Sequence, residues 1–366
     1  MIKKKILHVV GARPNFMKIA PIVREMSNYP DEFEQMLVHT GQHYDANMSQ
    51  IFFEELEMPR PDINLEVGSG SHATQTAQIM QKFEKVLINY KPDWILVPGD
   101  VNSTIACALV ASKLGVKIAH VEAGLRSFDR TMPEEINRVL TDQVSDLLLT
   151  PSKDADENLM REGIAPAKIR FVGNVMIDTL VRLMPKAEVR WPNLRDEYKL
   201  DRYILVTLHR PSNVDDPNAL AEIMSAVTEI SEQIPVLFPV HPRTRSRISS
   251  LKLNQSNRQL ILTEPMGYLD FLALQMKAAL LLTDSGGIQE ETTYLGIPCL
   301  TARPNTERPV TITNGTNQLV ESRATALLKA IRQTLNNDHG QKNLQRPELW
   351  DGGTAERISR LFKTIA

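Results

Sequence analysis

The chain has 366 residues, more than a single hydrophobic core usually serves, so two domains are expected. Its 42 Lys and Arg residues nearly balance 44 Asp and Glu residues, which gives a net charge of −2. This balance argues against a protein that binds nucleic acid or a charged membrane surface. The two cysteines, Cys107 and Cys299, lie far apart without Cys or His companions. This argues against a disulfide scaffold or a zinc site and favours a reducing compartment, the cytoplasm.

No segment approaches the roughly 18 apolar residues of a membrane span. Lysines near the N-terminus precede a short apolar run that His8 interrupts, and this run fits a first β-strand better than a signal peptide. We therefore expect a soluble protein.

Segments typical of strands and of helices alternate along the chain. Strands are expected at residues 6–10, 35–40, 94–97, 118–121, 147–150 and 169–172, and again at 203–208, 236–240, 259–263, 280–282 and 299–302. Amphipathic helices are expected at residues 16–27, 74–90, 103–114, 134–144 and 354–365. The polar, proline-containing segment 185–199 interrupts this alternation. The pattern predicts two doubly wound α/β domains, residues 1–175 and 176–352.

In such sheets ligands bind at the carboxyl ends of the strands, so the loops there are the candidate sites. After the first strand, Gly11 permits a tight turn, and Arg13 and Lys18 place two cations near a helix N-terminus. The pair suits a diphosphate, although two solvated helix cations remain the alternative. Neither the GxGxxG dinucleotide fingerprint nor the P-loop pattern is present.

Carboxylates follow two neighbouring strands of the first domain. Asp100 and Glu122 each come at a strand end, and Glu134 opens a helix nearby in sequence. Clustered carboxylates raise one another's pKa values, which is useful for proton transfer near neutral pH. We expect the three to face a cleft as a cluster, with ordinary surface and first-turn acids as the alternative.

His and Arg residues follow two strands of the second domain. His209 and Arg210 end one strand, and His241 and Arg243 end the next. Two such pairs indicate a binding site for an anion. A metal site is disfavoured because no third ligand has suitable spacing.

The segment 280–296 predicts a strand, a turn at Ser285, Gly286 and Gly287, and a helix from Ile288. Free N–H groups and the helix dipole at such a point suit a phosphate, and Glu290 or Glu291 would then reach a ribose. A plain turn followed by helix-capping acids is the alternative. Tyr268 and Phe271 would offer an aromatic face to a base, although a core role is the default for Phe271.

Eight motifs in order resemble the non-hydrolysing UDP-N-acetylglucosamine 2-epimerases: GARPNFMKIAPI, TGQHYD, GDVNST, HVEAGLRS, MPEEINR, TLHRPSN, PVHPRT and LTDSGGIQEE. The resemblance implies a fold of the glycosyltransferase B type, with two Rossmann-like domains facing a cleft and a C-terminal helix, residues 353–366, packed back on the first. It also implies a homodimer and no nicotinamide cofactor. The implied reaction inverts C2 of a UDP-N-acetylhexosamine, with UDP leaving C1 to give a 2-acetamidoglucal and then adding back.

The resemblance also assigns roles to residues. Asp100, Glu122 and Glu134 match the carboxylates that remove and return the C2 proton. Arg13, Lys18 and His209 match residues that neutralise the departing diphosphate. Further matches bind UDP: Ser285 and Gly286 at the phosphate turn, Glu291 at the ribose and Phe271 near uracil.

The motif at Gln42–Asp45 departs from the Arg-containing GQHR of members that a second UDP-GlcNAc molecule activates, which puts such activation in question. The same signature resembles epimerases that act on UDP-2,3-diacetamido-2,3-dideoxyglucuronic acid, so this substrate is the first alternative. A hydrolysing epimerase, a glycosyltransferase of the same fold and a non-catalytic nucleotide-sugar sensor remain further alternatives.

Overall fold

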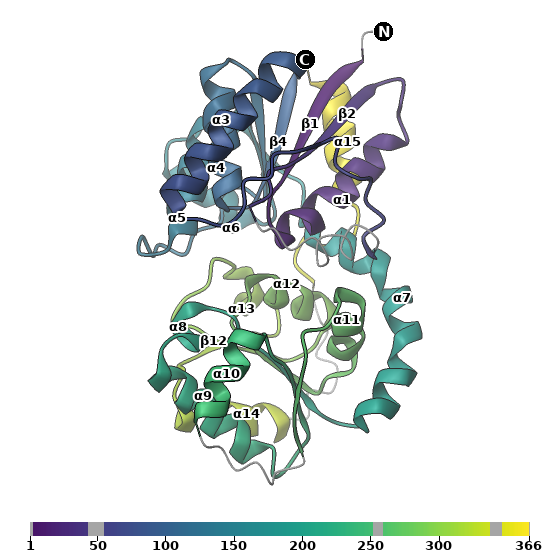
Figure 1. Cartoon of the computed structure of the whole chain (residues 1–366). Coiled ribbons are helices and arrows are strands. Elements are labelled where there is room, and N and C mark those ends of the chain that lie inside the picture. The colour runs from purple at the N-terminus through teal and green to yellow at the C-terminus, as the bar shows by residue number, and fades with distance from the viewer. Residues whose placement is uncertain (1–2, 43–54, 252–258, 337–345, 366) are drawn as a thin grey trace. The chain divides into compact units, whose positions relative to one another are not determined.

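The computed structural model describes residues 3–42, 55–251, 259–336 and 346–365 (Figure 1). The chain forms two compact units, Met1–Arg182 with Glu348–Ala366, and Leu183–Pro347. Each unit contains one parallel sheet with helices between its strands, which confirms the predicted doubly wound α/β class. The sequence placed the boundary after residue 175, whereas the units divide at Arg182. Within the described ranges, no helix is long and apolar enough to cross a membrane.

The first unit has a seven-stranded sheet in the order β3-β2-β1-β4-β5-β6-β7. Its strands are β1 (Lys4–Val10), β2 (Phe33–His39), β3 (Ile63–Asn64), β4 (Trp94–Pro98), β5 (Lys117–Val121), β6 (Leu147–Thr150) and β7 (Ile169–Phe171). Its helices are α1 (Arg13–Ser27), α3 (His72–Tyr90), α4 (Asn102–Lys113), α5 (Pro133–Val144), α6 (Lys153–Arg161), the first part of α7 (Val175–Tyr198), α15 (Thr354–Thr364) and the short 3₁₀ helix Pro166–Lys168. The central strands are buried on both faces, as parallel strands between helices require.

The second unit has a six-stranded sheet in the order β10-β9-β8-β11-β12-β13. Its strands are β8 (Ile204–Thr207), β9 (Val236–Pro239), β10 (Leu260–Thr263), β11 (Leu280–Thr283), β12 (Cys299–Ala302) and β13 (Asn317–Val320). Its helices are α8 (Pro211–Val214), α9 (Pro217–Ile230), α10 (Pro242–Ser250), α11 (Tyr268–Lys277), α12 (Gly286–Leu295), α13 (Val310–Thr313) and α14 (Ala324–Asn336).

The segment 185–199, predicted as an irregular linker, is instead part of the helix α7. Leu180, Leu183, Ala187 and Leu194 are buried at spacings of three, four and seven residues, which is one face of a helix. Pro185 and Pro192 lie on the exposed face. Burial of the apolar face therefore outweighs the helix-breaking tendency of the two prolines.

The C-terminal helix α15 packs on the first unit, where it lies beside α1 (Figure 1). Asp178 of α7 accepts hydrogen bonds from the backbone N–H groups of Thr354 (3.1 Å) and Ala355 (2.6 Å), so its carboxylate caps this helix. At the other end, Phe362 meets the ring of Trp94 edge-on, with centroids 5.4 Å apart.

A buried histidine of β1 makes the stability of the protein depend on pH. Burial lowers the pKa of His8 to about 4, and a hydrogen bond with Gln35, which raises the pKa, offsets only part of this effect. The unfolded chain takes up this proton near pH 6.5, so the free energy of unfolding should fall by about 3 kcal/mol as the pH drops from 6.5 to 4. Urea unfolding of His8→Gln should show a smaller loss over this range. The control His72→Gln replaces an exposed histidine and should lose as much stability as the wild-type protein. An equal loss in His8→Gln would contradict the assignment.

Candidate active site

Each sheet has one point at which the strand order reverses. In doubly wound folds, ligands bind at this point, just outside the carboxyl ends of the two strands that flank it. In the first unit this point lies between β1 and β4, and in the second between β8 and β11. The loops that follow these four strands begin at Gly11, Gly99, Leu208 and Asp284. The sequence-predicted site residues after these strands therefore flank the two expected ligand positions.

Beside the first of these points, Lys18 of α1 and Glu122, which follows the next strand β5, form a buried ion pair. Lys18 Nζ lies 2.8 Å from Glu122 Oε1, although the residues are 104 positions apart. Asn15 joins the flanking loops, because its Oδ1 accepts from the N–H of Gly11 (3.1 Å) and its Nδ2 donates to the carbonyl of Pro98 (3.0 Å). The predicted cation and the predicted carboxylate are thus brought together.

The backbone of Glu122 is strained. Its φ of 72° lies in the left-handed region, which costs a non-glycine residue about 1–3 kcal/mol. The N–H groups of Glu122 and Ala123 both donate to the carbonyl of Leu149, at 3.1 and 3.0 Å, and hold the turn in place. Such strain is found preferentially at functional sites, which supports a functional role for this side chain.

The three predicted carboxylates differ in their surroundings. Asp100 pairs with Arg138, whose Nε donates to Asp100 Oδ2 at 3.2 Å, and Glu122 pairs with Lys18. The side chain of Glu134 is exposed at the first turn of α5. The sequence predicted carboxylates that repel one another, whereas the structure provides Asp100 and Glu122 each with a buried cation.

The buried acid of α5 is Glu135, the neighbour of the predicted Glu134. Its carboxylate accepts hydrogen bonds from the backbone N–H groups of Ser127 and Phe128, both at 2.9 Å, and from Arg138. It therefore holds the loop after β5 and orients the arginine that binds Asp100. The spacing in the sequence distinguishes the two acids, because Glu135 and not Glu134 lies on the buried face of α5 with Arg138 and Asp142.

A buried His–Asp pair connects the loops that carry Asp100 and Glu122. His120 Nε2 lies 2.7 Å from the carbonyl oxygen of Gly99, and its Nδ1 lies 2.6 Å from Asp142 Oδ1. The other oxygen of Asp142 accepts from the N–H of Gly124 at 3.2 Å. The pair therefore fixes the residue before Asp100 and the turn after Glu122, a role that the sequence did not reveal.

A methyl group at Gly99 should disturb this site. Gly99 has a φ of +62°, and a Cβ there would lie 2.8 Å from Lys18 Nζ. Gly115 is the matched control, because its φ is +71° and no atom lies within 4 Å of its Cβ position. Both Gly→Ala variants should lose about 1–2 kcal/mol of stability through backbone strain. Only Gly99→Ala should also displace the Lys18 ammonium. Its turnover should therefore fall by roughly tenfold or more, which corresponds to a rise of at least about 1.4 kcal/mol in the activation free energy. Equal kinetics in the two variants would contradict the proposed role of Lys18.

In the second unit, the buried Asp284 orients His209. Asp284 Oδ1 lies 3.0 Å from His209 Nδ1, and the backbone N–H groups of His209 (3.1 Å) and Arg210 (2.9 Å) donate to the same carboxylate. Burial alone would raise the pKa of Asp284, but the contacts with His209, the N–H of Arg210 and Asn213 outweigh it and lower the pKa. Asp284 holds the Nδ1 side of the His209 ring. Because the His209 side chain is 61% exposed, its Nε2 is left for a ligand.

The helix α12 begins at Gly286, so the two glycines form its first turn and not the turn before it. Ser285 occupies the N-cap position but makes no capping hydrogen bond with its side chain, which leaves the N-terminal N–H groups without that partner. Arg308 lies against this turn, since a Cβ at Gly286 would be 2.6 Å from its Nη1. The arginine pairs with Glu290 at 2.7 Å. An anion site at this helix start fits the arrangement.

The remaining predicted UDP-binding residues have the following surroundings. Glu291 is buried and accepts a hydrogen bond from Tyr268 OH at 2.8 Å. Tyr268 is itself buried, so its ring does not offer a free aromatic face. Phe271 is half-buried in the first turn of α11. Arg210 donates from Nε to the carbonyl of Asp284 at 3.1 Å, and the side chain of His241 is exposed after β9.

Some predictions fall outside the described part of the chain. They concern the motif residues His43, Tyr44 and Asp45 and the side chains of Arg13 and Arg243. Among the described residues, no three His, Cys, Asp or Glu side chains converge as a metal site requires.

Comparison with known proteins identifies the family. A family model described as UDP-N-acetylglucosamine 2-epimerase matches residues 24–363. The chain is 44% identical over 367 residues to the UDP-N-acetylglucosamine 2-epimerase of Methanocaldococcus jannaschii, covering 98% of both chains. It is 43% identical over 365 residues to the UDP-2,3-diacetamido-2,3-dideoxy-D-glucuronate 2-epimerase of Pseudomonas aeruginosa, covering 99% of both.

A solved structure agrees with these sequence matches. The crystal structure of the Methanocaldococcus jannaschii UDP-GlcNAc 2-epimerase in complex with UDP-GlcNAc and UDP superposes with a TM-score of 0.89 at 45% identity, covering 98% of this chain and 99% of that one. The resemblance found in the eight sequence motifs is thereby confirmed, and the chain belongs to the UDP-N-acetylglucosamine 2-epimerase family.

Proposed function

We propose that the protein interconverts UDP-GlcNAc and UDP-ManNAc without hydrolysis. A base removes the C2 proton, the C1–O bond breaks, and UDP leaves with the bonding electron pair, so that a C1=C2 double bond forms. UDP then adds back to C1 while an acid delivers a proton to the opposite face of C2. The buried Lys18–Glu122 pair, beside the point where the strand order reverses, is the observation that carries this proposal.

In this proposal the carboxylates Asp100, Glu122 and Glu134 exchange protons with C2. Glu122 is suited to this role because it is buried, strained and held by two backbone hydrogen bonds. Lys18 pairs with its carboxylate before reaction and supplies positive charge for the departing diphosphate. The Arg138–Asp100 pair orients the second carboxylate.

The second unit, in this proposal, binds UDP. The helix start at Ser285, Gly286 and Gly287 binds a phosphate, with Arg308 as an additional cation. His209, oriented by Asp284, protonates or neutralises the leaving diphosphate oxygen. Arg210 and His241 add positive charge, and Glu291 and Phe271 bind the ribose and uracil.

A second substrate has a specific observation in its favour. The Pseudomonas aeruginosa relative named for UDP-2,3-diacetamido-2,3-dideoxy-D-glucuronate is 43% identical to this chain, and the Methanocaldococcus jannaschii relative named for UDP-N-acetylglucosamine is 44% identical. The same elimination and addition at C2 apply to that sugar. A glycosyltransferase activity has no comparable support, since fold alone does not select it.

A product assay tests the proposal. Purified protein incubated with UDP-GlcNAc and no acceptor should yield UDP-ManNAc, seen by anion-exchange chromatography, with no accumulation of free sugar. Free ManNAc with stoichiometric UDP would identify the hydrolysing reaction instead. Turnover of only the diacetamido-uronate would identify the alternative substrate, and no turnover of either would contradict the proposal.

The remaining features of the proposal concern the cellular setting. We propose a homodimer that supplies precursors for surface polysaccharides, on the family resemblance alone. Both cysteines are free and buried, which suits a reducing compartment such as the cytoplasm.

A further inference from the structure

The carboxylate of Glu307, in the second unit, is buried among three arginines. The residue is 1% exposed and lies in the loop between β12 and α13. Arg303 binds it as a fork, since Nη1 donates to Glu307 Oε2 at 2.9 Å and Nη2 donates to Oε1 at 2.7 Å. Arg210 Nη2 donates to Oε1 at 3.3 Å, and Arg308 Nη1 donates to Oε2 at 3.4 Å. Each oxygen of this carboxylate therefore accepts hydrogen bonds from two arginines.

Through these arginines, Glu307 connects three parts of the proposed UDP site. Arg210 lies in the loop after β8. Arg303 comes immediately after β12, the strand on the other side of β11. Arg308 lies against the first turn of α12, where a Cβ at Gly286 would be 2.6 Å from its Nη1. One buried carboxylate thus joins the loops after β8 and β12 to the helix start at which a phosphate is proposed to bind.

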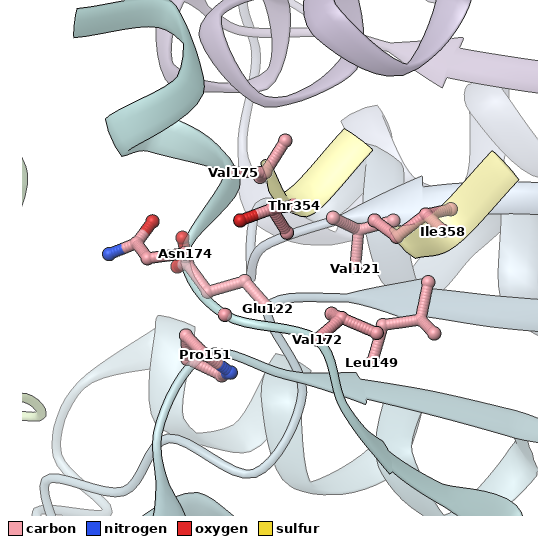
Figure 2. A pocket seen from close by; sticks show the side chains of 10 residues that line it. Val121, Glu122, Leu149, Pro151, Val172, Asn174, Val175, Thr354 and Ile358 are labelled. Atoms are coloured by element: carbon pink, nitrogen blue, oxygen red, sulfur yellow. The ribbon is translucent and has the colours of Figure 1, made fainter. Parts of the chain in front are cut away.

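Glu307 is not arranged for proton transfer, in contrast to Glu122. Glu122 pairs with Lys18 and lines a small pocket with mostly apolar walls (Figure 2). Burial alone would raise the pKa of Glu307, but its contacts with the three arginines outweigh burial and hold the pKa well below the usual range of a carboxyl group. Such a carboxylate stays ionised and is a poor proton acceptor near neutral pH. Its contacts instead suit it to holding the arginines in place.

We propose that Glu307 is a positioning residue for the diphosphate of UDP. Its carboxylate holds the guanidinium groups of Arg210 and Arg308 at the phosphate site, and the fork from Arg303 fixes the carboxylate itself. The inference rests on the proposed function, in which the second unit binds UDP. Three guanidinium groups repel one another, so without a shared acceptor they would turn apart toward water. Holding them together before the ligand arrives removes the cost of ordering them on binding.

The test is the affinity of the full-length protein for UDP and for uridine, which lacks the diphosphate, measured by isothermal titration. In Glu307→Gln, an NH2 group replaces one carboxylate oxygen and can no longer accept from the arginines on that side. Coulomb attraction alone predicts tighter UDP binding, because the variant removes a negative charge from an anion site. Positioning predicts the opposite, a rise of about tenfold or more in the dissociation constant of UDP, because displaced arginines no longer reach the phosphates. The dissociation constant of uridine should change by less than about twofold.

A milder variant and a control accompany this measurement. Arg303→Lys keeps the positive charge but replaces the two-pronged guanidinium with a single ammonium, so it should loosen Glu307 with less risk to the fold. The Arg303 side chain is 3% exposed and bonded to Glu307, so it acts on UDP only through that carboxylate. UDP affinity should fall in this variant as well, by a smaller factor, with uridine affinity unchanged. The control Glu321→Gln alters an exposed acid paired with Arg323 and should change neither affinity.

Three results would overturn the inference. UDP affinity that is unchanged or higher in both Glu307→Gln and Arg303→Lys would show that the carboxylate does not position the arginines. Equal losses of UDP and uridine affinity would show a structural role only. Equal affinities of the wild-type protein for UDP and uridine would show that the diphosphate is not bound at this site. Failure of the proposed function is a separate observation, namely absent turnover of the UDP-sugars by a wild-type protein that binds UDP.

Discussion

Replacing Glu122 with Gln should reduce epimerisation by about a thousandfold while the affinity for UDP changes by less than about tenfold. A glutamine oxygen can still accept a hydrogen bond from Lys18, so the buried ammonium keeps a partner, but the amide cannot take a proton from C2. UDP should be retained because the second unit supplies most of its proposed contacts. The measurements are the steady-state rate with UDP-GlcNAc and the dissociation constant of UDP by titration.

The control for Glu122→Gln is Glu157→Gln, which alters an exposed acid of α6 paired with Arg161. It should change neither quantity, since exposed pairs contribute little. A loss of UDP affinity greater than about tenfold, or about 1.4 kcal/mol, with an intact fold would show that Glu122 serves UDP binding and not proton transfer. Retained turnover in Glu122→Gln would contradict its role directly.

Replacing Asp284 with Asn should lower kcat by about a hundredfold to ten-thousandfold, because His209 then loses the carboxylate that fixes its ring. Loss of the orienting aspartate in a Ser-His-Asp enzyme lowers kcat about ten-thousandfold, which is the upper end of this range. Asp284 is also a structural residue, since its carboxylate accepts from two backbone N–H groups and from Asn213. The measurement must therefore separate a catalytic defect from a folding defect.

A double-mutant cycle provides that separation. If Asp284 acts through His209, the variant Asp284→Asn should cause little further loss of kcat once His209 has been replaced by Ala, because residues that act as a unit are not additive. Independent losses that multiply would show that Asp284 only stabilises the unit. The surface control Asp201→Asn, whose side chain is 84% exposed, should leave kcat unchanged.

Most of the fold could be predicted from the sequence because parallel strands buried on both faces are short apolar runs between amphipathic helices. The elements that were missed lack this signal. Strand β3 has two residues, and β13 reads Asn-Gln-Leu-Val, so neither forms a clear apolar run. The helix α7 was missed because its prolines and charges dominate the segment, whereas its buried positions recur on one face.

The site could be predicted only as a set of residues at strand ends. The partners that define its chemistry are distant in sequence: Lys18 from Glu122, Arg138 from Asp100, and Asp284 from His209. Their pairing depends on the order of strands in each sheet, which periodicity does not determine. For Asp284 the sequence offered one clue, an acid immediately after the buried strand β11.

In the proposed reaction, the C2–H bond breaks and re-forms while the sugar returns to UDP. This can be tested by NMR of the purified protein with UDP-GlcNAc alone in D2O, following the C2 and anomeric signals. We expect UDP-ManNAc that carries deuterium at C2, with the sugar still attached to UDP. UDP-ManNAc formed with full retention of the C2 proton would contradict proton exchange between the carboxylates and the solvent, and free ManNAc would contradict re-addition of UDP.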